Sequence, residues 1–313
     1  MPFIKSLRQY GIFLAFVIIC CFLSYANSQF LTVSNWSIIF TQVAINSLLA
    51  FGVTFLIITG GIDLSIGSIV AVAGVVAALL ASQPNLPLIL PILGGLLAGL
   101  LFGFINGLII TKSKIAPFIV TLGIMTIGRG LALILSKGRP ISNLSDSFNF
   151  IGGGVVFGVP FPIIILIVVF IFSYLLLKKT VFGRYVYAIG GNEQAAFASG
   201  INVTKIKMSV YALCGTLAGL AGILLTSRIT TGQPNAGAGF ELDAIAAAII
   251  GGTSTSGGTG TIIGTLIGAL LIGVINNGLD LLNVSSYYQQ VIMGAIIIGA
   301  VLLDSWNQKK MAS

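Results

Sequence analysis

The stretch LILPILGGLLAGLLFGFINGLIIT, residues 88–111, contains 24 residues and no charged side chain. A helix needs roughly 20 apolar residues to cross the hydrocarbon core of a bilayer, so this stretch is long enough to cross a membrane. Its glycines Gly95, Gly99 and Gly103 recur every four residues. This spacing lets a second helix backbone approach closely where lipid gives no hydrophobic drive for association. We therefore predict a tightly packed transmembrane helix here.

The composition of the whole chain extends this prediction. Of the 313 residues, 57% are hydrophobic and 7% are charged, and the mean hydropathy is +1.10. A soluble domain carries about 25% charged residues, so this chain cannot cover itself with a water-facing surface. We predict an all-α membrane protein that forms a single transmembrane domain over residues 1–313.

Ten segments are apolar enough to be transmembrane helices. They are residues 10–26, 38–58, 64–82, 88–111, 117–136, 161–177, 208–228, 242–254, 261–280 and 287–304. The eighth segment is short, because its apolar character ends at Ile250. We interpret it as a partial or re-entrant span, which needs protein around it. The prediction is thus a bundle of about ten transmembrane helices.

The basic residues predict the orientation, because short cytoplasmic loops carry an excess of lysine and arginine. With ten spans, four basic groups that hold 11 of the 15 basic residues fall on one side. The groups are Lys5 and Arg8; Lys112 and Lys114; Lys178, Lys179, Arg184, Lys205 and Lys207; and Lys309 and Lys310. We assign that side, and both termini, to the cytoplasm. Because the basic residues are scattered between apolar runs, the net charge of +8 does not indicate nucleic-acid binding.

Two parts of the chain resemble one another. LLFGFINGL, residues 100–108, is similar to LLIGVINNGL, residues 270–279, and Asn106 matches Asn276. With ten spans, the two copies run in opposite directions. Spans two to five and seven to ten then form an inverted repeat, a common transporter construction. The alternative is a chance resemblance between helices rich in glycine and leucine.

The residue types needed for cofactor or enzyme chemistry are scarce. GGTSTSGGTG, residues 251–260, resembles a phosphate-binding loop, but Gly258 stands where such a loop needs its lysine. We interpret it as a flexible or close-packed turn. The chain has no histidine, and Cys20, Cys21 and Cys214 all lie in apolar segments. We therefore predict no catalytic residues, no metal site and no cofactor bound by this chain.

Several polar residues fall within or beside the predicted spans. Arg129 lies inside the fifth span, where a charge usually marks a pairing partner or a transport pathway. We expect it to pair with a carboxylate or to face a water-filled cavity, and we favour the structural pair. Asp63 precedes the third span and can cap its helix, although a direct transport role is the alternative. We assign Asn106, Asp243 and Asn276 to the same structural class, as helix caps or bonds between helices.

The longest predicted cytoplasmic loop covers about residues 178–207. Within it, Asn192 suits the N-cap of a short helix, Glu193 suits its first turn, and Gly200 can end it. A helix of this length is marginal in isolation. It must dock either on a partner or, alternatively, on its own protein.

Five motifs together resemble the permease subunits of sugar ABC importers, and the ribose type in particular. They are GGIDLSIG (60–67), YAIGGNEQAAFASGINVTKIK (187–207), ELDAIAAAIIGGTS (241–254), GTLIGALLIGVINNGL (264–279) and NVSSYYQQ (283–290). The resemblance covers nearly the whole chain. It implies a homodimer in the lipid of a bacterial inner or cytoplasmic membrane that imports ribose or a similar monosaccharide. It also implies two further partners: a cytoplasmic protein that binds ATP and Mg²⁺, and an extracytoplasmic sugar-binding protein.

The resemblance also implies roles for particular residues. In this family, residues 190–200 correspond to the coupling helix that docks on the ATPase. The coupling residues here are Gly190, Gly191, Asn192, Glu193, Ala195, Ala196, Ser199 and Gly200. We choose pathway candidates from the fifth and tenth spans, which correspond in the predicted repeat: Thr121, Met125, Arg129, Gln289 and Gln290. The alternative function is a secondary transporter of a small neutral polar solute, which would need no ATPase.

Overall fold

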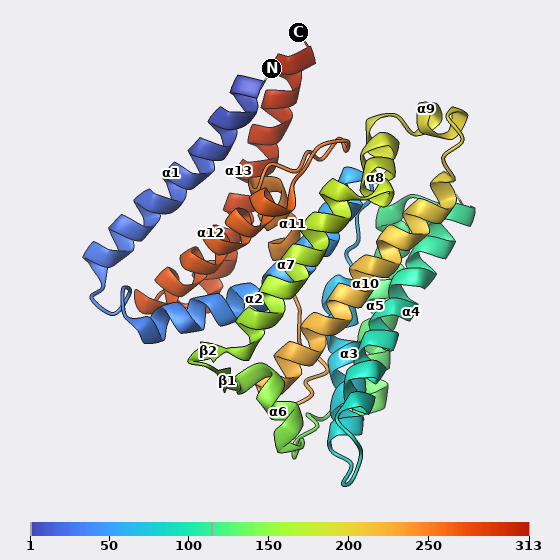
Figure 1. Ribbon diagram of the computed structural model, residues 1–313. Coiled ribbons are helices and arrows are strands. Elements are labelled where there is room, and N and C mark those ends of the chain that lie inside the picture. Colours follow the sequence, from blue (N-terminus) through green and yellow to red (C-terminus); the bar gives the residue numbers. More distant parts are fainter. Residues whose placement is uncertain (1, 114, 313) are drawn as a thin grey trace.

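The computed structural model describes residues 2–113 and 115–312, and this part of the chain forms thirteen helices and one short β-hairpin (Figure 1). The helices are α1 (Pro2–Ala26), α2 (Val33–Ile58), α3 (Ile66–Ala81), α4 (Ile89–Ser113), α5 (Pro117–Ser136), α6 (Asp146–Gly153), α7 (Phe161–Lys179), α8 (Val181–Gly191), α9 (Glu193–Ala198), α10 (Val203–Arg228), α11 (Phe240–Ile250), α12 (Ile262–Leu281) and α13 (Ser286–Ala312). The antiparallel hairpin consists of β1 (Val155–Val156) and β2 (Val159–Pro160).

Each of the ten predicted apolar segments contains one helix, so the all-α membrane architecture is confirmed. Among the described residues, six helices are long and apolar enough to cross a membrane: α2, α4, α5, α7, α10 and α12. Helix α3 and the apolar parts of α1 and α13 are shorter. Helix α11 has 11 residues, so at 1.5 Å per residue it is about 16 Å long, half a bilayer core. The predicted total of about ten crossings stays a prediction.

The centre of the bundle consists of α2, α3 and α10, and most side chains of α2 and α3 are buried. Helix α4 packs against α10 through glycines on both helices. A Cβ added at Gly99 would overlap the carbonyl oxygen of Gly215, and one added at Gly215 would overlap the carbonyl oxygen of Gly99. The close backbone approach predicted from the glycine spacing of α4 is thus confirmed.

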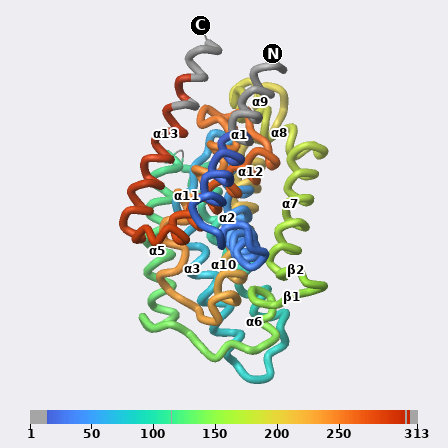
Figure 2. Tube along the Cα trace, turned by 90° about the vertical axis from the view of Figure 1, so that its left-hand side faces the viewer, coloured from blue at the N-terminus to red at the C-terminus, as the bar shows by residue number. Residues whose placement is uncertain are grey.

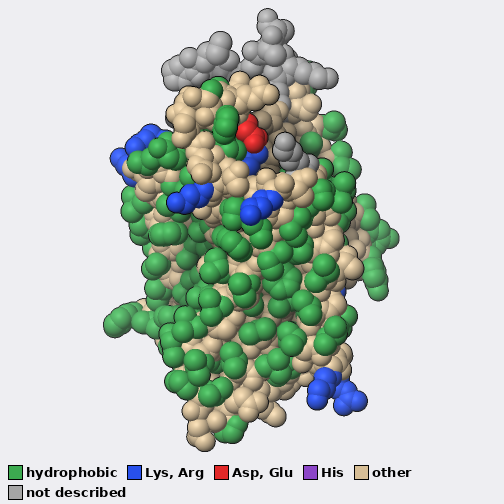
Figure 3. Space-filling view, turned by 90° about the vertical axis from the view of Figure 1, so that its right-hand side faces the viewer, with side chains coloured by type: hydrophobic (Ala, Val, Ile, Leu, Met, Phe, Trp, Pro, Cys, Tyr) green, Lys and Arg blue, Asp and Glu red, His purple; other side chains and the backbone are tan. Residues whose placement is uncertain are grey.

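The molecule has two ends of different character. One end, which we call the loop end, contains the helices α8 and α9, the start of α1 and the end of α13 (Figures 1 and 2). Helix α6 and the β-hairpin lie at the other side, the hairpin end. Figure 3 shows lysine and arginine side chains gathered near both ends and a hydrophobic band between them.

The elements place most of the described basic residues at the loop end. These are Lys112, Lys178, Lys179, Arg184, Lys205 and Lys207, whereas Lys137 and Arg139 follow α5 at the hairpin end. The side chains of Lys5, Arg8, Lys114, Lys309 and Lys310 lie outside the described residues. The predicted positive side therefore coincides with the loop end as far as the described side chains extend.

Candidate functional site

The short helix α9 at the loop end has well-formed caps. The Asn192 side chain accepts a hydrogen bond from the backbone N–H of Ala195 at 2.9 Å. At the other end, Gly200 has a positive φ of 84°, and its N–H donates to the Phe197 carbonyl at 2.9 Å. The Ile201 N–H donates to the Ala196 carbonyl at 3.1 Å, which completes a Schellman motif. The predicted helix start at Asn192 and stop at Gly200 are confirmed.

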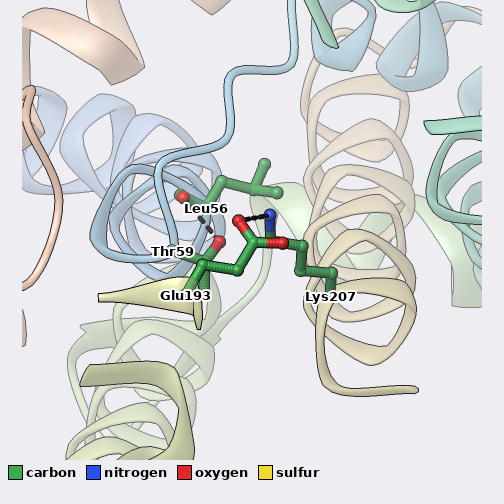
Figure 4. A network of polar contacts seen from close by, with 4 residues as sticks. All are labelled: Leu56, Thr59, Glu193 and Lys207. Atoms are coloured by element: carbon green, nitrogen blue, oxygen red, sulfur yellow. Dashed lines mark hydrogen bonds and ion pairs between the residues drawn. The ribbon is translucent and has the colours of Figure 1, made fainter. Parts of the chain in front are cut away.

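An ion pair ties α9 to α10. The Lys207 ammonium and the Glu193 carboxylate lie 2.6 Å apart, and Figure 4 shows the two side chains pointing toward one another. The same view includes the end of α2, where the Thr59 hydroxyl donates to the Leu56 carbonyl at 2.8 Å. Because the Glu193 side chain is 54% exposed, solvent weakens the attraction. Such exposed pairs contribute about 0.2–1 kcal/mol.

A first prediction follows from this ion pair. Changing Glu193 to Gln should loosen α9 only slightly, so its backbone amides should exchange hydrogen less than about 5-fold faster. Hydrogen exchange of residues 195–198 would measure this effect. High salt should reproduce it in the unchanged protein by screening the charges. An acceleration far above that limit would mean that the pair, and not the caps, holds α9 in place.

The side chains of α9 divide into an anchor and an exposed set. Ala196 is 5% exposed and holds the helix against the protein, whereas Phe197 is 73% exposed. Beside Phe197, a cavity of about 750 Å³ lies between α9, the end of α4 and the start of α10. Its walls are mostly apolar and include Ile110, Pro117 and the Phe197 ring. The sequence prediction for this helix did not include Phe197, although it is the one large apolar side chain of α9.

Helix α8 connects α9 to the interior of the bundle. A Cβ added at Gly190 would overlap the carbonyl oxygen of Ile58, at the end of α2. That carbonyl accepts a hydrogen bond from the Gly258 N–H at 2.9 Å, and the Tyr187 hydroxyl donates to the Gly260 carbonyl at 2.7 Å. The glycine-rich stretch 251–260 is thus a close-packed turn, as the sequence predicts, and it rests on α8.

Arg129 has a structural partner, but the partner is backbone and not a carboxylate. Its Nη1 donates to the carbonyl oxygens of Pro234 and Ala236 at 2.8 and 2.9 Å. These residues belong to the connection between α10 and α11. The guanidinium therefore holds an irregular segment against α5.

The other pathway candidates do not gather around Arg129. Thr121 is fully buried and donates to the Pro117 carbonyl at 2.9 Å, while Met125 is partly exposed on the same helix. Gln289 lies in the first turn of α13 and donates to the Asp280 carboxylate at 2.8 Å. Gln290 beside it is exposed. The five candidates are therefore spread over different depths of the bundle.

A buried polar cluster connects α3 to α4. The Asp63 carboxylate accepts hydrogen bonds from the Ser65 N–H at 2.8 Å, the Ser65 hydroxyl at 2.5 Å and the Asn106 amide at 3.2 Å. The Asn106 amide also donates to the Ser65 hydroxyl at 2.8 Å. Asp63 is 1% exposed. Asp63 therefore positions the start of α3 and joins it to a neighbouring helix. The predicted helix cap is wrong, because Ser65 occupies the N-cap position of α3 and no side chain caps this helix.

The second half of the chain does not repeat this cluster. Asp243 lies in the first turn of α11. The buried amide on α12 is Asn277, which exchanges hydrogen bonds of 3.0 and 2.8 Å with Asn35. Asn276 beside it is only partly buried. The inverted repeat therefore stays a prediction, because the matched residues make different contacts.

Comparison with known proteins decides the class of this helical bundle. Residues 35–301 match the family model described as the branched-chain amino acid transport system / permease component. The chain belongs to this permease family. Among its relatives are the ribose import permease proteins RbsC of Bacillus subtilis, 52% identical over 95% of this chain and 93% of the relative, and of Haemophilus influenzae, 47% identical over 94% and 92%. The protein of that name in Escherichia coli K12 is 43% identical over 94% and 93%.

No solved structure matches the chain. The family fixes its general class nonetheless. The permease is a multi-pass protein of the bacterial cell membrane and a membrane subunit of an ABC transporter for sugars.

Proposed function

We propose that this permease is the membrane subunit of a ribose importer, and that a separate ATPase drives it by binding α9. Ribose is the substrate that the names of the three relatives give for those proteins. The observation that carries the proposal is α9 itself. It is a short, fully capped helix at the end of the bundle with a phenylalanine ring that is 73% exposed.

The charge distribution supports a cytoplasmic position for α9. The described lysines and arginines that flank it, including Arg184, Lys205 and Lys207, lie at the loop end. Positive residues in short loops favour the cytoplasmic side. On this basis the loop end and both termini are cytoplasmic, and the sugar-binding protein docks at the hairpin end.

The packing of α8 supports a route for the mechanical signal. An ATPase that binds α9 differently in its two nucleotide states can shift the permease between two conformations. A displacement of α9 would move α8, which contacts the end of α2 at Ile58 and the turn 251–260. That turn connects α11 to α12, so the signal reaches both halves of the chain. The permease works as a homodimer, with sugar passing between two copies.

Reconstitution tests the proposal against a secondary transporter. We expect liposomes that hold the permease, its ATPase and its sugar-binding protein to take up ribose only when ATP is present. Liposomes with the permease alone should take up none, with or without an ion gradient. Uptake by the permease alone along an ion gradient would overturn the proposal. Competition by other pentoses and by hexoses measures the sugar preference.

A further inference from the structure

The connection between α10 and α11 enters the interior of the bundle without forming a helix. It begins at the hairpin end and follows α3 inward. A Cβ added at Gly232 would overlap the Ala78 side chain, near the end of α3, and one added at Gly237 would lie 2.6 Å from the Gly67 carbonyl oxygen, in its first turn. These two positions on α3 are about 16 Å apart at 1.5 Å per residue. The segment 232–237 therefore extends into the bundle as irregular backbone, and α11 continues from it toward the turn 251–260 at the loop end.

Irregular backbone at membrane depth is tolerated only where protein surrounds it or where it lines a water-filled cavity. One side of this segment meets the first condition. Gly232, Pro234 and Gly237 are buried. The carbonyls of Pro234 and Ala236, which no helix satisfies, accept hydrogen bonds from Arg129.

The opposite side of the segment carries two exposed amide side chains, Gln233 and Asn235. Among the residues that the structure describes, neither side chain has a hydrogen-bond partner. An amide facing hydrocarbon without a partner is unfavourable by several kcal/mol. These side chains must therefore face water or polar groups. Arg129 ties the backbone of this segment to α5, which lies on the same side of the bundle as α13 and away from α7 (Figure 2).

We propose that Gln233 and Asn235 line the sugar pathway inside the membrane and hydrogen-bond to the hydroxyl groups of a neutral monosaccharide; this inference rests on the proposed transport function. An amide both donates and accepts hydrogen bonds, as a sugar hydroxyl does, and carries no charge that would trap a cation. Arg129 acts as a positioning residue, because it fixes the backbone between and beside the two amides. The pathway candidates chosen from sequence did not include this segment.

Cysteine accessibility tests whether the surface formed by Gln233 and Asn235 is exposed to water. In a variant whose three native cysteines are replaced by alanine, we expect Gln233→Cys and Asn235→Cys to react with a water-soluble, membrane-impermeant thiol reagent, and ribose to slow the reaction. The matched control is Leu97→Cys on α4, 53% exposed in an apolar span, which should stay unlabelled. Two unreactive cysteines would overturn the proposal, because the face would then be covered by lipid or by the second copy.

Transport by the full complex provides the second readout. Replacing both Gln233 and Asn235 with Leu should lower the rate of ribose uptake about 10-fold or more, the combined effect of two lost hydrogen bonds. Binding of the ATPase should not change, because α9 is distant from these positions. If the unchanged complex imports ribose and the double variant does so at the same rate, this inference alone fails. If the unchanged complex imports no ribose, the proposed function fails. The cysteine labelling then still shows whether Gln233 and Asn235 are exposed to water.

Discussion

Loss of the Phe197 ring should uncouple the transporter. In the Phe197→Ala variant, we expect the affinity for the ATPase to fall about 30-fold or more, because an aromatic anchor at the centre of an interface contributes about 2–4 kcal/mol. Phe197 fits this role since it is 73% exposed on a helix that the Asn192 cap and the Gly200 motif hold in place. Its removal leaves the buried anchor Ala196 untouched, so α9 should keep its shape.

The measurement is binding of the purified ATPase to the detergent-solubilised permease, followed by ATP-driven ribose uptake in liposomes. Phe157 provides a matched control, because its ring is fully exposed in the turn between β1 and β2, at the opposite end of the molecule. We expect Phe157→Ala to bind the ATPase as the parent does. Equal affinity for Phe197→Ala and the parent would contradict the proposed role of α9. Loss of affinity in both variants would indicate a general folding defect.

The shape of α9 was predictable from the sequence because its signals are local. An N-cap asparagine and a C-terminal glycine need only their own turn of helix to act. Which side chain of α9 points outward depends on the helix beside it, and here Ala196 packs inward while Phe197 does not. Phe197, from which we expect the largest contact with the ATPase, was therefore not among the coupling residues predicted from the sequence. Choosing it from sequence would require the tertiary contacts of α9.

The connection between α10 and α11 illustrates a second limit. The sequence predicts a partial eighth span, because its apolar run is short, and α11 is a short helix. The segment before it, with Gln233 and Asn235, lies between the predicted spans 208–228 and 242–254 and belongs to neither. Only the contacts with Arg129 and with α3 place it inside the bundle. The partner of Arg129 was missed for the same reason. Every residue has a backbone carbonyl, so a sequence does not show which carbonyls will accept a hydrogen bond from an arginine.

The sequence prediction chose Asn276 for a structural role, whereas Asn277 makes the contact between helices. The reason for this error lies in the geometry of the helix. Neighbouring residues on a helix point about 100° apart, and α12 is apolar on all sides. The hydropathy pattern then does not decide which asparagine faces the core. The fold allows only Asn277 to reach Asn35 on α2.

Replacing Gly99 with Leu should have the largest effect on folding. Its α-carbon lies so close to α10 that even one added carbon would overlap the Gly215 carbonyl oxygen and lie 2.8 Å from the Gly219 backbone. Backbone atoms cannot rotate aside as a side chain can, so α4 and α10 would have to separate. Overpacking a core typically costs about 1–3 kcal/mol, occasionally more. We expect the upper part of this range or beyond, because the affected contact joins α4 to α10, one of the helices at the centre of the bundle.

Thermal unfolding of the detergent-solubilised permease, followed by the loss of its monodisperse chromatographic peak, measures this effect. A destabilisation of that size is a large share of the roughly 5–15 kcal/mol that holds a typical protein together, so Gly99→Leu should melt several degrees lower or fail to accumulate. Gly99→Ala should show a smaller effect of the same sign. Gly123→Leu on α5 is the control, because an added Cβ there meets nothing within 4 Å. Equal melting of the Gly99 and Gly123 variants would mean that α4 and α10 are not held by direct backbone contact, and the glycine spacing would then need another explanation.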